Sequence, residues 1–337
     1  MSKKGKVLAN SFLYTFSTLL IRAINFILLP VYTLFLTPVD YGITNLISSF
    51  TNVATYVIAF SLYSAIIRFY ADYKYDEVKL KRFYGTVIIF VAISGAIFVS
   101  SGFLLHTLLV SWLFEGVAFY PIVAISLITL TFTCFHSIHQ YIMQGMQQGK
   151  KLTIVNLIVF AFQVGLNLLF IGVFKYGAVG VLIATLIINS GYFLYMLFDL
   201  NKNHLVTLCL DKKLLKEALK YSVPLMPHNL STSIAGFTSR VFINNNGSLA
   251  SVGLYSVASQ FSVIIDTIQA AVNRAFSPWF YDIMNNGENK NEVISLSRFL
   301  LILYSLLYMG IGLFSQEVII LMTNEKYFMA WTAIPVL

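Results

Sequence analysis

The sequence predicts an all-α polytopic membrane protein, and three observations carry that prediction. The chain is 58% hydrophobic and only 11% charged. Its apolar residues fall into ten long stretches, and its Lys and Arg residues gather in alternate loops between them. A soluble domain of this length could not keep so much apolar surface from water, so lipid must be its solvent.

Windows of about 20 apolar residues place the predicted spans near Val7 to Phe35, Gly42 to Ile67, Phe83 to Leu109, Phe119 to Met143, Leu152 to Phe174, Gly177 to Leu200, Tyr221 to Ile243, Val252 to Tyr281, Phe299 to Met322, and from Phe328 onward. Hydrocarbon offers no water to backbone groups, so each span should be a helix, and the uninterrupted lengths argue against barrel strands. The last window holds about ten residues, too few to cross the bilayer at ~1.5 Å per residue. We therefore expect the second half of the molecule to be incomplete in this chain.

The distribution of basic residues over the loops predicts how the bundle is oriented in the membrane. When the loops are assigned to the two sides in turn, 17 of the 22 basic residues fall on the side of the N-terminus. This asymmetry predicts a cytoplasmic N-terminus. The Lys-rich start has too long an apolar run for a signal peptide and is read as a retained first span. The net charge of +8 is explained by these loops, and no nucleic-acid partner is needed.

Spans one and seven share a polar pattern that predicts two repeated lobes. Both carry a 4-3-4 spacing, in Ser11, Thr15, Thr18 and Arg22 and in Asn229, Ser233, Gly236 and Arg240. Six spans separate the copies, so the repeats should be parallel, about an axis along the membrane normal. We expect an N-terminal lobe of six helices over 1–200, a cytoplasmic amphipathic linker over 201–220, and part of a C-terminal lobe of about four helices over 221–337.

Polar residues also form stripes on otherwise apolar helices. Asn25 extends the stripe of span one, and span eight carries Ser256, Ser259, Gln260, Asp266, Thr267, Asn273, Arg274 and Ser277 within about 140° of the helix. Span four has a thinner stripe, Thr129, Thr133, His136 and Gln140. Small polar residues in membranes commonly just join helices through weak hydrogen bonds. For these residues alone that structural role is the better explanation.

The arginines within the spans need a different explanation. A charge at mid-membrane costs from about 2.5 to over 10 kcal/mol, and Arg22, Arg240 and Arg274 all lie inside predicted spans. Asp266 is the one acid deep in a span, so it can neutralise at most one of them. We expect the surplus charge to face a wet cavity and meet an anion such as a phosphate. The alternative pairs Asp266 with Arg240 or Arg274 and lets Arg22 snorkel.

Other reactive residues give weaker signals. Arg68, at the inner end of span two, is explained by the loop charges, with a gate role as a further expectation. His136 and His139 are expected to be core or cavity-lining residues, because no Cys, Asp or Glu in that span completes a metal site. Cys134 and Cys209 lie in different environments, so no disulfide is expected. No nucleotide-binding or nucleophile motif is visible, and we expect neither enzyme activity nor a cofactor.

Three segments resemble bacterial polysaccharide flippases, the Wzx-type O-antigen transporters of the multidrug/oligosaccharidyl-lipid/polysaccharide exporter superfamily. They are PVYTLFLTPVDYG after span one, PLMPHNLSTSIAGFTSRVFI through span seven, and VGLYSVASQ at the start of span eight. The similarity runs the whole length of the chain, although members share hydropathy and turns more than an invariant residue set. Such proteins usually have twelve or more spans, which agrees with an incomplete second lobe.

The resemblance implies a function. Such proteins move an undecaprenyl-diphosphate-linked oligosaccharide from the cytoplasmic to the periplasmic leaflet of the bacterial inner membrane, by alternating access, for O-antigen, capsule or exopolysaccharide synthesis. A polysaccharide polymerase and chain-length proteins would be partners. The cationic cavity of the family transfers to Arg22, Arg240 and Arg274, whose guanidinium groups suit a diphosphate. Sugar hydroxyls would bond to Asn25, Asn229, Gln260 and Asn273, and Asp266 would serve coupling or pairing.

Three alternatives stay open at this point. A cation-coupled multidrug exporter of the same fold should line its cavity with carboxylates, which one buried acid against three arginines disfavours. A lipid II flippase would use the same kind of cationic cavity. A non-transporting scaffold for an envelope polysaccharide complex would keep its arginines merely paired, and would tolerate their loss.

Overall fold

The computed structural model describes residues 19–286 and 290–337, with only part of the side chains within 270–290. Every element in this part of the chain is a helix. Six helices are long and apolar enough to cross a membrane, and the bent pair α3 (Pro38–Ile58) and α4 (Leu62–Tyr73) makes a seventh if it counts as one span. The prediction of an all-α polytopic membrane protein is confirmed.

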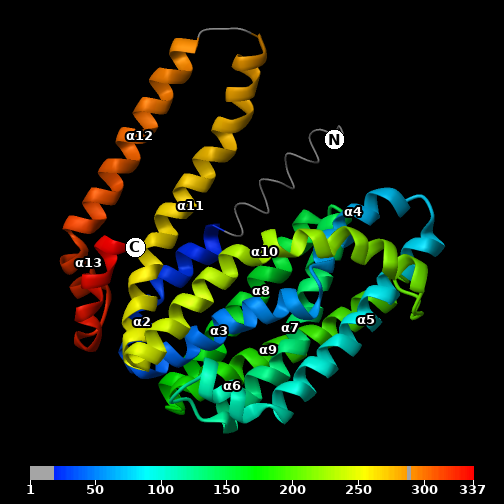
Figure 1. Ribbon diagram of the computed structural model, residues 1–337, viewed down its shortest axis with the longest axis horizontal. Helices are drawn as coiled ribbons and strands as arrows, with labels where there is room; N and C mark the ends of the chain where they lie inside the picture. Colours follow the sequence, from blue (N-terminus) through cyan, green and yellow to red (C-terminus); the bar gives the residue numbers. More distant parts are fainter. Residues whose placement is uncertain (1–18, 287–289) are drawn as a thin grey trace.

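Most helices form one bundle, and the last long helices lean away from it (Figure 1). Besides α3 and α4, the described elements are α2 (Leu29–Phe35), α5 (Glu77–Leu104), α6 (His106–Leu113), η1 (Phe119–Val123), α7 (Ala124–Gly145), α8 (Gly149–Leu168), η2 (Leu169–Val173), α9 (Gly177–Lys202), α10 (Lys212–Asn246), α11 (Leu249–Asn286), α12 (Lys290–Leu313), α13 (Ser315–Met322) and η3 (Glu325–Val336). Residues 19–27 are also helical. Helices α3, α5, α9 and α10 lie roughly along one direction, and α11 and α12 rise from one end of the bundle.

The turn before α3 is fixed by Asp40. Its carboxylate accepts hydrogen bonds from the Thr37 backbone N–H (3.2 Å) and hydroxyl (2.6 Å), while the Thr37 hydroxyl accepts from the Asp40 N–H (3.1 Å). This capping box satisfies donors that the helix start leaves free. The other Asp40 oxygen accepts the Ala178 N–H at 3.0 Å. One carboxylate therefore ties the start of α3 to the start of α9.

Predicted span two is broken rather than continuous. Phe60 and Ser61 have φ of 47° and 54°, a left-handed conformation that α-helices do not contain, and α4 continues at 47° to α3. The break frees the Ile58 carbonyl, and the Ser94 hydroxyl of α5 donates to it at 2.7 Å. No Gly or Pro marks this position in the sequence, so the break was not predicted.

The amphipathic segment expected at 201–220 continues directly into span seven. Asp211 caps α10 by accepting the N–H groups of Lys213 (2.9 Å) and Leu214 (3.2 Å). From there one helix of 35 residues runs to Asn246. It packs against α3, α4 and α5, so span seven lies alongside the N-terminal bundle. The window from Phe328 differs too, because it lies in the 3₁₀ helix η3, whose Tyr327 is buried and donates its hydroxyl to the Leu36 carbonyl at 3.1 Å.

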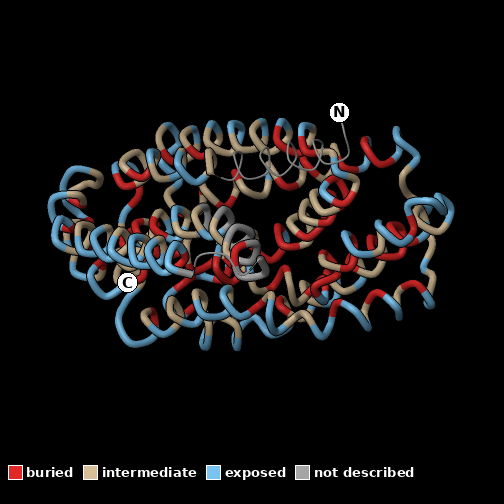
Figure 2. The backbone as a smooth tube through the Cα atoms, turned by 90° about the horizontal axis from the view of Figure 1, so that it is seen from above, coloured by how far each residue is buried: buried red, intermediate tan, exposed pale blue. Residues whose placement is uncertain are grey.

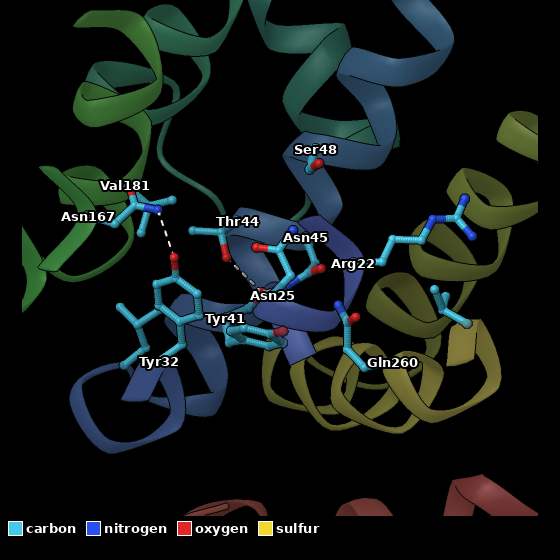
Figure 3. Close-up of a pocket in the computed structure, with 12 residues that line it drawn as sticks. Arg22, Asn25, Tyr32, Tyr41, Thr44, Asn45, Ser48, Asn167, Val181 and Gln260 are labelled. Carbon is cyan, nitrogen blue, oxygen red and sulfur yellow. Dashed lines mark hydrogen bonds between the residues drawn. The ribbon is translucent and has the colours of Figure 1, made fainter. Parts of the chain in front are cut away.

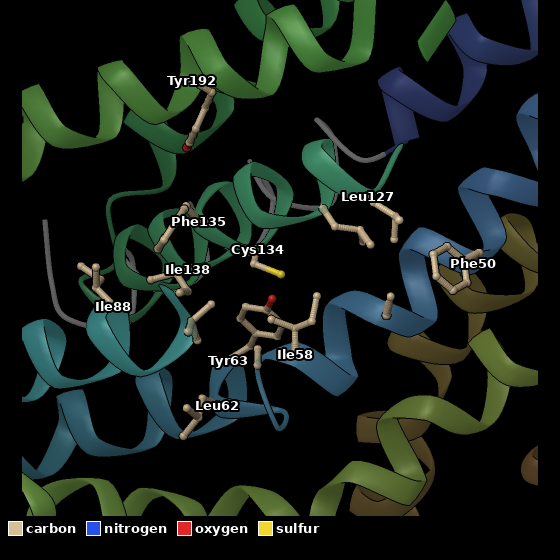
Figure 4. Packing of buried hydrophobic residues seen from close by; sticks show 14 of the residues in the cluster. Phe50, Ile58, Leu62, Tyr63, Ile88, Leu127, Cys134, Phe135, Ile138 and Tyr192 are labelled. Carbon is tan, nitrogen blue, oxygen red and sulfur yellow. The ribbon is translucent and has the colours of Figure 1, made fainter. Parts of the chain in front are cut away.

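Buried residues lie inside the bundle and exposed ones on its outer surface (Figure 2). In the core, Ile58 of α3 and Tyr63 of α4 lie beside Cys134 and Ile138 of α7 (Figure 4), and Phe50 belongs to the same buried cluster further along α3. The outer surface is also apolar, with large exposed side chains on most helices. In a protein dissolved in lipid these outward apolar side chains meet acyl chains.

Helices α3 and α11 cross in close backbone contact. A Cβ added at Gly42 would overlap the carbonyl oxygen of Leu249, and one added at Gly253 would overlap the carbonyl oxygen of Pro38. The contacts are reciprocal. Gly42 lies four residues after Pro38 on α3, and Gly253 lies four residues after Leu249 on α11. Glycines let membrane helices approach backbone to backbone, and such reciprocity is what two halves related by a two-fold axis would give.

We expect Gly253→Ala to destabilise the protein, because the added methyl group forces α3 and α11 apart, an overpacking cost of about 1 to 3 kcal/mol. Thermal unfolding in detergent measures the effect as a lowered melting temperature. Gly310→Ala is the matched control, since a Cβ at Gly310 meets nothing within 4 Å. Equal melting temperatures for the two variants would contradict the tight crossing.

Candidate functional site

A polar cavity of about 290 Å³ lies where residues 19–27, α2, α3, α8, α9 and α11 meet (Figure 3). Its polar lining consists of Arg22, Asn25, Tyr32, Tyr41, Thr44, Asn45, Ser48, Asn167 and Gln260, and its apolar lining of Leu36, Val181 and Val263. We call it the Arg22 cavity. Among these lining residues Arg22 is the one charged group. The cavity therefore offers one positive charge among hydroxyl and amide groups.

The helical period brings Arg22 and Asn25 to the same side of residues 19–27, three positions apart. Gln260 reaches the cavity from α11. The Arg22 guanidinium donates a hydrogen bond to the Thr267 hydroxyl of α11, Nη1 to Oγ1, at 2.7 Å. Three residues that the sequence analysis placed in the substrate site, Arg22, Asn25 and Gln260, thus line one cavity.

Side chains of the wall are held in place by hydrogen bonds. The Asn167 amide donates to the Tyr32 hydroxyl at 3.2 Å, and Gln163 donates to Asn167 at 3.0 Å. On α3, the Thr44 hydroxyl (3.0 Å) and the Asn45 amide (2.8 Å) both donate to the Tyr41 carbonyl. Their remaining donor and acceptor positions are available to a polar ligand.

Arg240 occupies a separate position between α10 and α11. Its Nε donates to the Ser256 hydroxyl at 3.3 Å, its Nη1 donates to the Gly236 carbonyl at 2.9 Å, and the guanidinium lies 5.6 Å from the centre of the Tyr255 ring. Arg240 does not line the Arg22 cavity. Arg22 and Arg240 contact α11 at Thr267 and Ser256, which are eleven residues apart, or about 16 Å at ~1.5 Å per residue. One phosphate group therefore cannot contact both arginines in this conformation.

Within the described part of the chain, neither arginine has a carboxylate partner. Among the described residues, the ion pairs involve neither Arg22 nor Arg240. Asp266 is exposed on α11 and pairs with neither of them, so the structural pairing of Asp266 with Arg240 is absent. Their hydrogen bonds go to neutral hydroxyl and carbonyl groups, so no described residue neutralises the charge of Arg22 or of Arg240.

The other predicted site residues lie elsewhere. Asn229 donates to the Ser64 hydroxyl of α4 at 3.3 Å, eleven residues before Arg240 on the same helix. Asn273 is exposed on α11, beyond the cavity lining. The side chain of Arg274, like residues Ser11, Thr15 and Thr18, lies outside the described part of the structure. Arg68, expected as a gate, is exposed and forms an ion pair with Asp72 at 3.0 Å.

The contribution of α3 to the cavity was not predicted from the sequence. Thr44, Ser48, Thr51 and Thr55 repeat the 4-3-4 spacing of span one, and this pattern could have identified the helix as a cavity wall. Thr44, Ser48 and Thr51 also line a second cavity of about 280 Å³, which shares Thr44, Ser48 and Val181 with the first. The predicted stripe of span four contributes Thr129 and Thr133 to this second cavity.

The histidines of α7 are structural residues of this bundle. His136 Nδ1 lies 3.0 Å from the Asn189 amide oxygen, and Asn189 lines the second cavity. His139 is fully buried and lies 3.1 Å from the carboxylate of Asp199, which also accepts both hydrogen bonds of Lys151 at 2.6 Å. The prediction of cavity-lining or core histidines agrees with these contacts.

Comparisons with known proteins agree with the fold. Residues 7–284 match the family described as polysaccharide biosynthesis protein. An Lsg locus protein of Haemophilus influenzae is 30% identical over 66 residues, which cover 20% of this chain and only 16% of that relative. A solved structure named protein A has a TM-score of 0.56 at 14% identity over 97% of this chain and 75% of that one. A crystal structure of a MATE mutant has a TM-score of 0.45 at 16% identity, covering 97% of this chain and 76% of that one.

We expect a cysteine placed in the Arg22 cavity to react with a water-soluble maleimide. Ser48 is exposed and lines the cavity, whereas neighbouring Ser49 is buried and donates to the Leu46 carbonyl at 2.7 Å. In a Cys209→Ser background, Ser48→Cys should be labelled at least tenfold faster than Ser49→Cys, as measured by mass spectrometry of the purified protein. Equal rates would mean that water does not enter the cavity.

Proposed function

Because the chain belongs to the polysaccharide biosynthesis protein family, we propose that it carries a lipid-linked oligosaccharide across the membrane. The cargo class is an undecaprenyl-diphosphate-linked oligosaccharide repeat unit. The chain would act as a flippase in the bacterial inner membrane, with its N-terminus in the cytoplasm and transport toward the periplasmic leaflet.

The observation that carries the proposal is the charge balance of the Arg22 cavity. Arg22 has no carboxylate partner among the described residues, and the groups around it are hydroxyls and amides. A cation within membrane helices is costly unless water or an anion meets it. A diphosphate supplies that anion, and a guanidinium can contact two phosphate oxygens at once.

The remainder of the lining suits a sugar. Hydroxyl and amide groups can both donate to and accept from sugar hydroxyls, and Asn25, Asn45 and Gln260 supply amides around Arg22. The lipid tail would stay in hydrocarbon, where its apolar surface costs nothing, while the charged head group crosses through the polar region. A carrier for cationic drugs would need carboxylates here, and the described lining contains none.

Arg22 and Arg240 fit a relay better than a single tight site. They reach α11 about 16 Å apart along the helix axis, at Thr267 and Ser256 respectively. Movement of α11 against α3 about the Gly42 and Gly253 crossing would bring the cavity to face one leaflet and then the other. In this scheme Arg22 and Arg240 receive the diphosphate at different stages of alternating access.

The first test of the function removes the Arg22 charge. In the host that carries this gene, deletion should abolish the surface glycan, and the full-length wild-type gene should restore it. Arg22→Ala at matched membrane levels should restore at least tenfold less glycan, because a charged hydrogen bond contributes about 1.5 to 3 kcal/mol. Staining of intact cells measures the glycan.

The control for this test is Arg82→Ala, which removes an exposed basic residue near the start of α5. It should restore glycan fully. If deletion of the gene leaves the surface glycan unchanged, the transport proposal is wrong. If Arg22→Ala restores glycan as well as the wild type, transport does not depend on the Arg22 cavity.

Arg240 tests the guanidinium geometry separately from its charge. Arg240→Ala should reduce surface glycan, and Arg240→Lys should retain part of the activity, because lysine keeps the charge but loses the planar fork. Quantitative glycan staining at matched protein levels distinguishes the three forms. Equal glycan in all three would remove Arg240 from the mechanism.

A further inference from the structure

A groove runs between α8 and α9 on the outside of the bundle, away from the Arg22 cavity. Its volume is about 600 Å³. On α8 it is lined by Val155, Ile158, Phe162 and Leu166, and on α9 by Ile187 and Gly191 among others. We call it the α8–α9 groove. Nothing in the proposed transport cycle uses it.

The α8–α9 groove faces the bilayer. Ile158 is 51% exposed and Phe162 is 64% exposed. Two polar residues of α8 point toward other helices, since Asn156 accepts a hydrogen bond from Gln140 of α7 at 2.9 Å and Asn167 donates to Tyr32 of α2 at 3.2 Å. An apolar groove at this place on a membrane protein is filled by hydrocarbon chains.

The groove's length matches one leaflet. From Val155 to Leu166 the helix advances eleven residues, about 16 Å at ~1.5 Å per residue. Half of a ~30 Å hydrocarbon core is about 15 Å. A phospholipid acyl chain, which spans one leaflet, fits this length, whereas an isoprenoid chain long enough to span both leaflets would extend beyond it.

One end of the groove is basic. A second hollow, of about 600 Å³, shares Val155 with the groove and is lined by Lys150 and Lys151. Lys151 is neutralised by Asp199 at 2.6 Å. Lys150 is exposed and forms no ion pair with any described residue. An unpaired ammonium group thus lies where an acyl chain in the groove would join its head group.

We propose that the α8–α9 groove is a binding site for an anionic phospholipid of the surrounding bilayer, with one acyl chain along the groove and the phosphate at Lys150. The Coulomb attraction of Lys150 selects an anionic head group over a zwitterionic one. This lipid site does not involve the transported cargo, so a failure of the lipid-binding proposal would leave the proposed transport function untouched, and the reverse also holds.

The glycines of the two helices allow a matched test. A Cβ added at Gly191, in the groove, or at Gly165, exposed on α8 and outside the groove lining, meets nothing within 4 Å. At both positions a new side chain therefore starts in open space, so Gly191→Phe places a ring in the groove and Gly165→Phe adds the same side chain beside it. Both variants should fold, which their thermal unfolding checks.

The experiment measures lipid binding by native mass spectrometry of the full chain in neutral detergent. Dioleoylphosphatidylglycerol should bind at least tenfold more tightly than dioleoylphosphatidylcholine. Gly191→Phe should weaken phosphatidylglycerol binding at least tenfold, and Gly165→Phe should change it less than twofold. Lys150→Gln should remove most of the preference for phosphatidylglycerol, whereas Lys216→Gln, an exposed lysine on α10, should not.

Four results would overturn the proposal. The first is equal affinity for the two phospholipids, and the second is unchanged binding in Gly191→Phe. The third is that undecaprenyl phosphate displaces phosphatidylglycerol when present at one tenth of the phosphatidylglycerol concentration. That result would make the groove a site for an isoprenoid tail. The fourth is a dimer that Gly191→Phe dissociates, which would make the groove a contact between copies of this chain.

Discussion

The arrangement of the whole molecule depends on the backbone contact between α3 and α11. Gly42 and Gly253 each face a carbonyl oxygen of the other helix, so no side chain separates the two backbones. Because the helices touch here, α11 lies against the N-terminal bundle at one end and leans away from it beyond (Figure 1). The Arg22 cavity lies beside this crossing and takes its walls from both helices. A wider crossing would separate Gln260 from Thr44 and Asn45.

The sequence predicts the helices better than their interruptions. The apolar windows between Phe119 and Leu200 agree with α7, α8 and α9 to within a few residues, because lipid requires apolar helices of fixed length. The break at Phe60 and Ser61 leaves no such trace, since it is stabilised by Ser94, distant in the chain. Within the cavity, Arg22, Asn25 and Gln260 were identifiable from stripes. Tyr32 and Asn167 were not, because tertiary packing alone brings α2 beside α8.

One face of α8 points toward a polar cavity and the other toward lipid. Its inner face carries Gln163 and Asn167, which hold the wall of a polar cavity through hydrogen bonds. Its outer face carries Ile158 and Phe162 and lines a groove open to lipid. The hydrogen bond from Asn167 to Tyr32 of α2 restrains the rotation of α8 about its own axis, and so helps to determine which apolar side chains form the groove. A change in the cavity wall would therefore also alter the lipid-facing surface.

The hydrogen bond between Arg22 and Thr267 has a kinetic consequence. A neutral hydroxyl occupies a position on Arg22 that a carboxylate would hold far more strongly. Exchange of one hydrogen bond for another changes the free energy by on the order of 1 kcal/mol, so in the proposed transport cycle an arriving anion would displace Thr267 readily. When the anion left, the hydroxyl would return to the guanidinium. In that cycle Thr267 would hold the place of the anion on Arg22 without binding the guanidinium too tightly for the cargo to exchange.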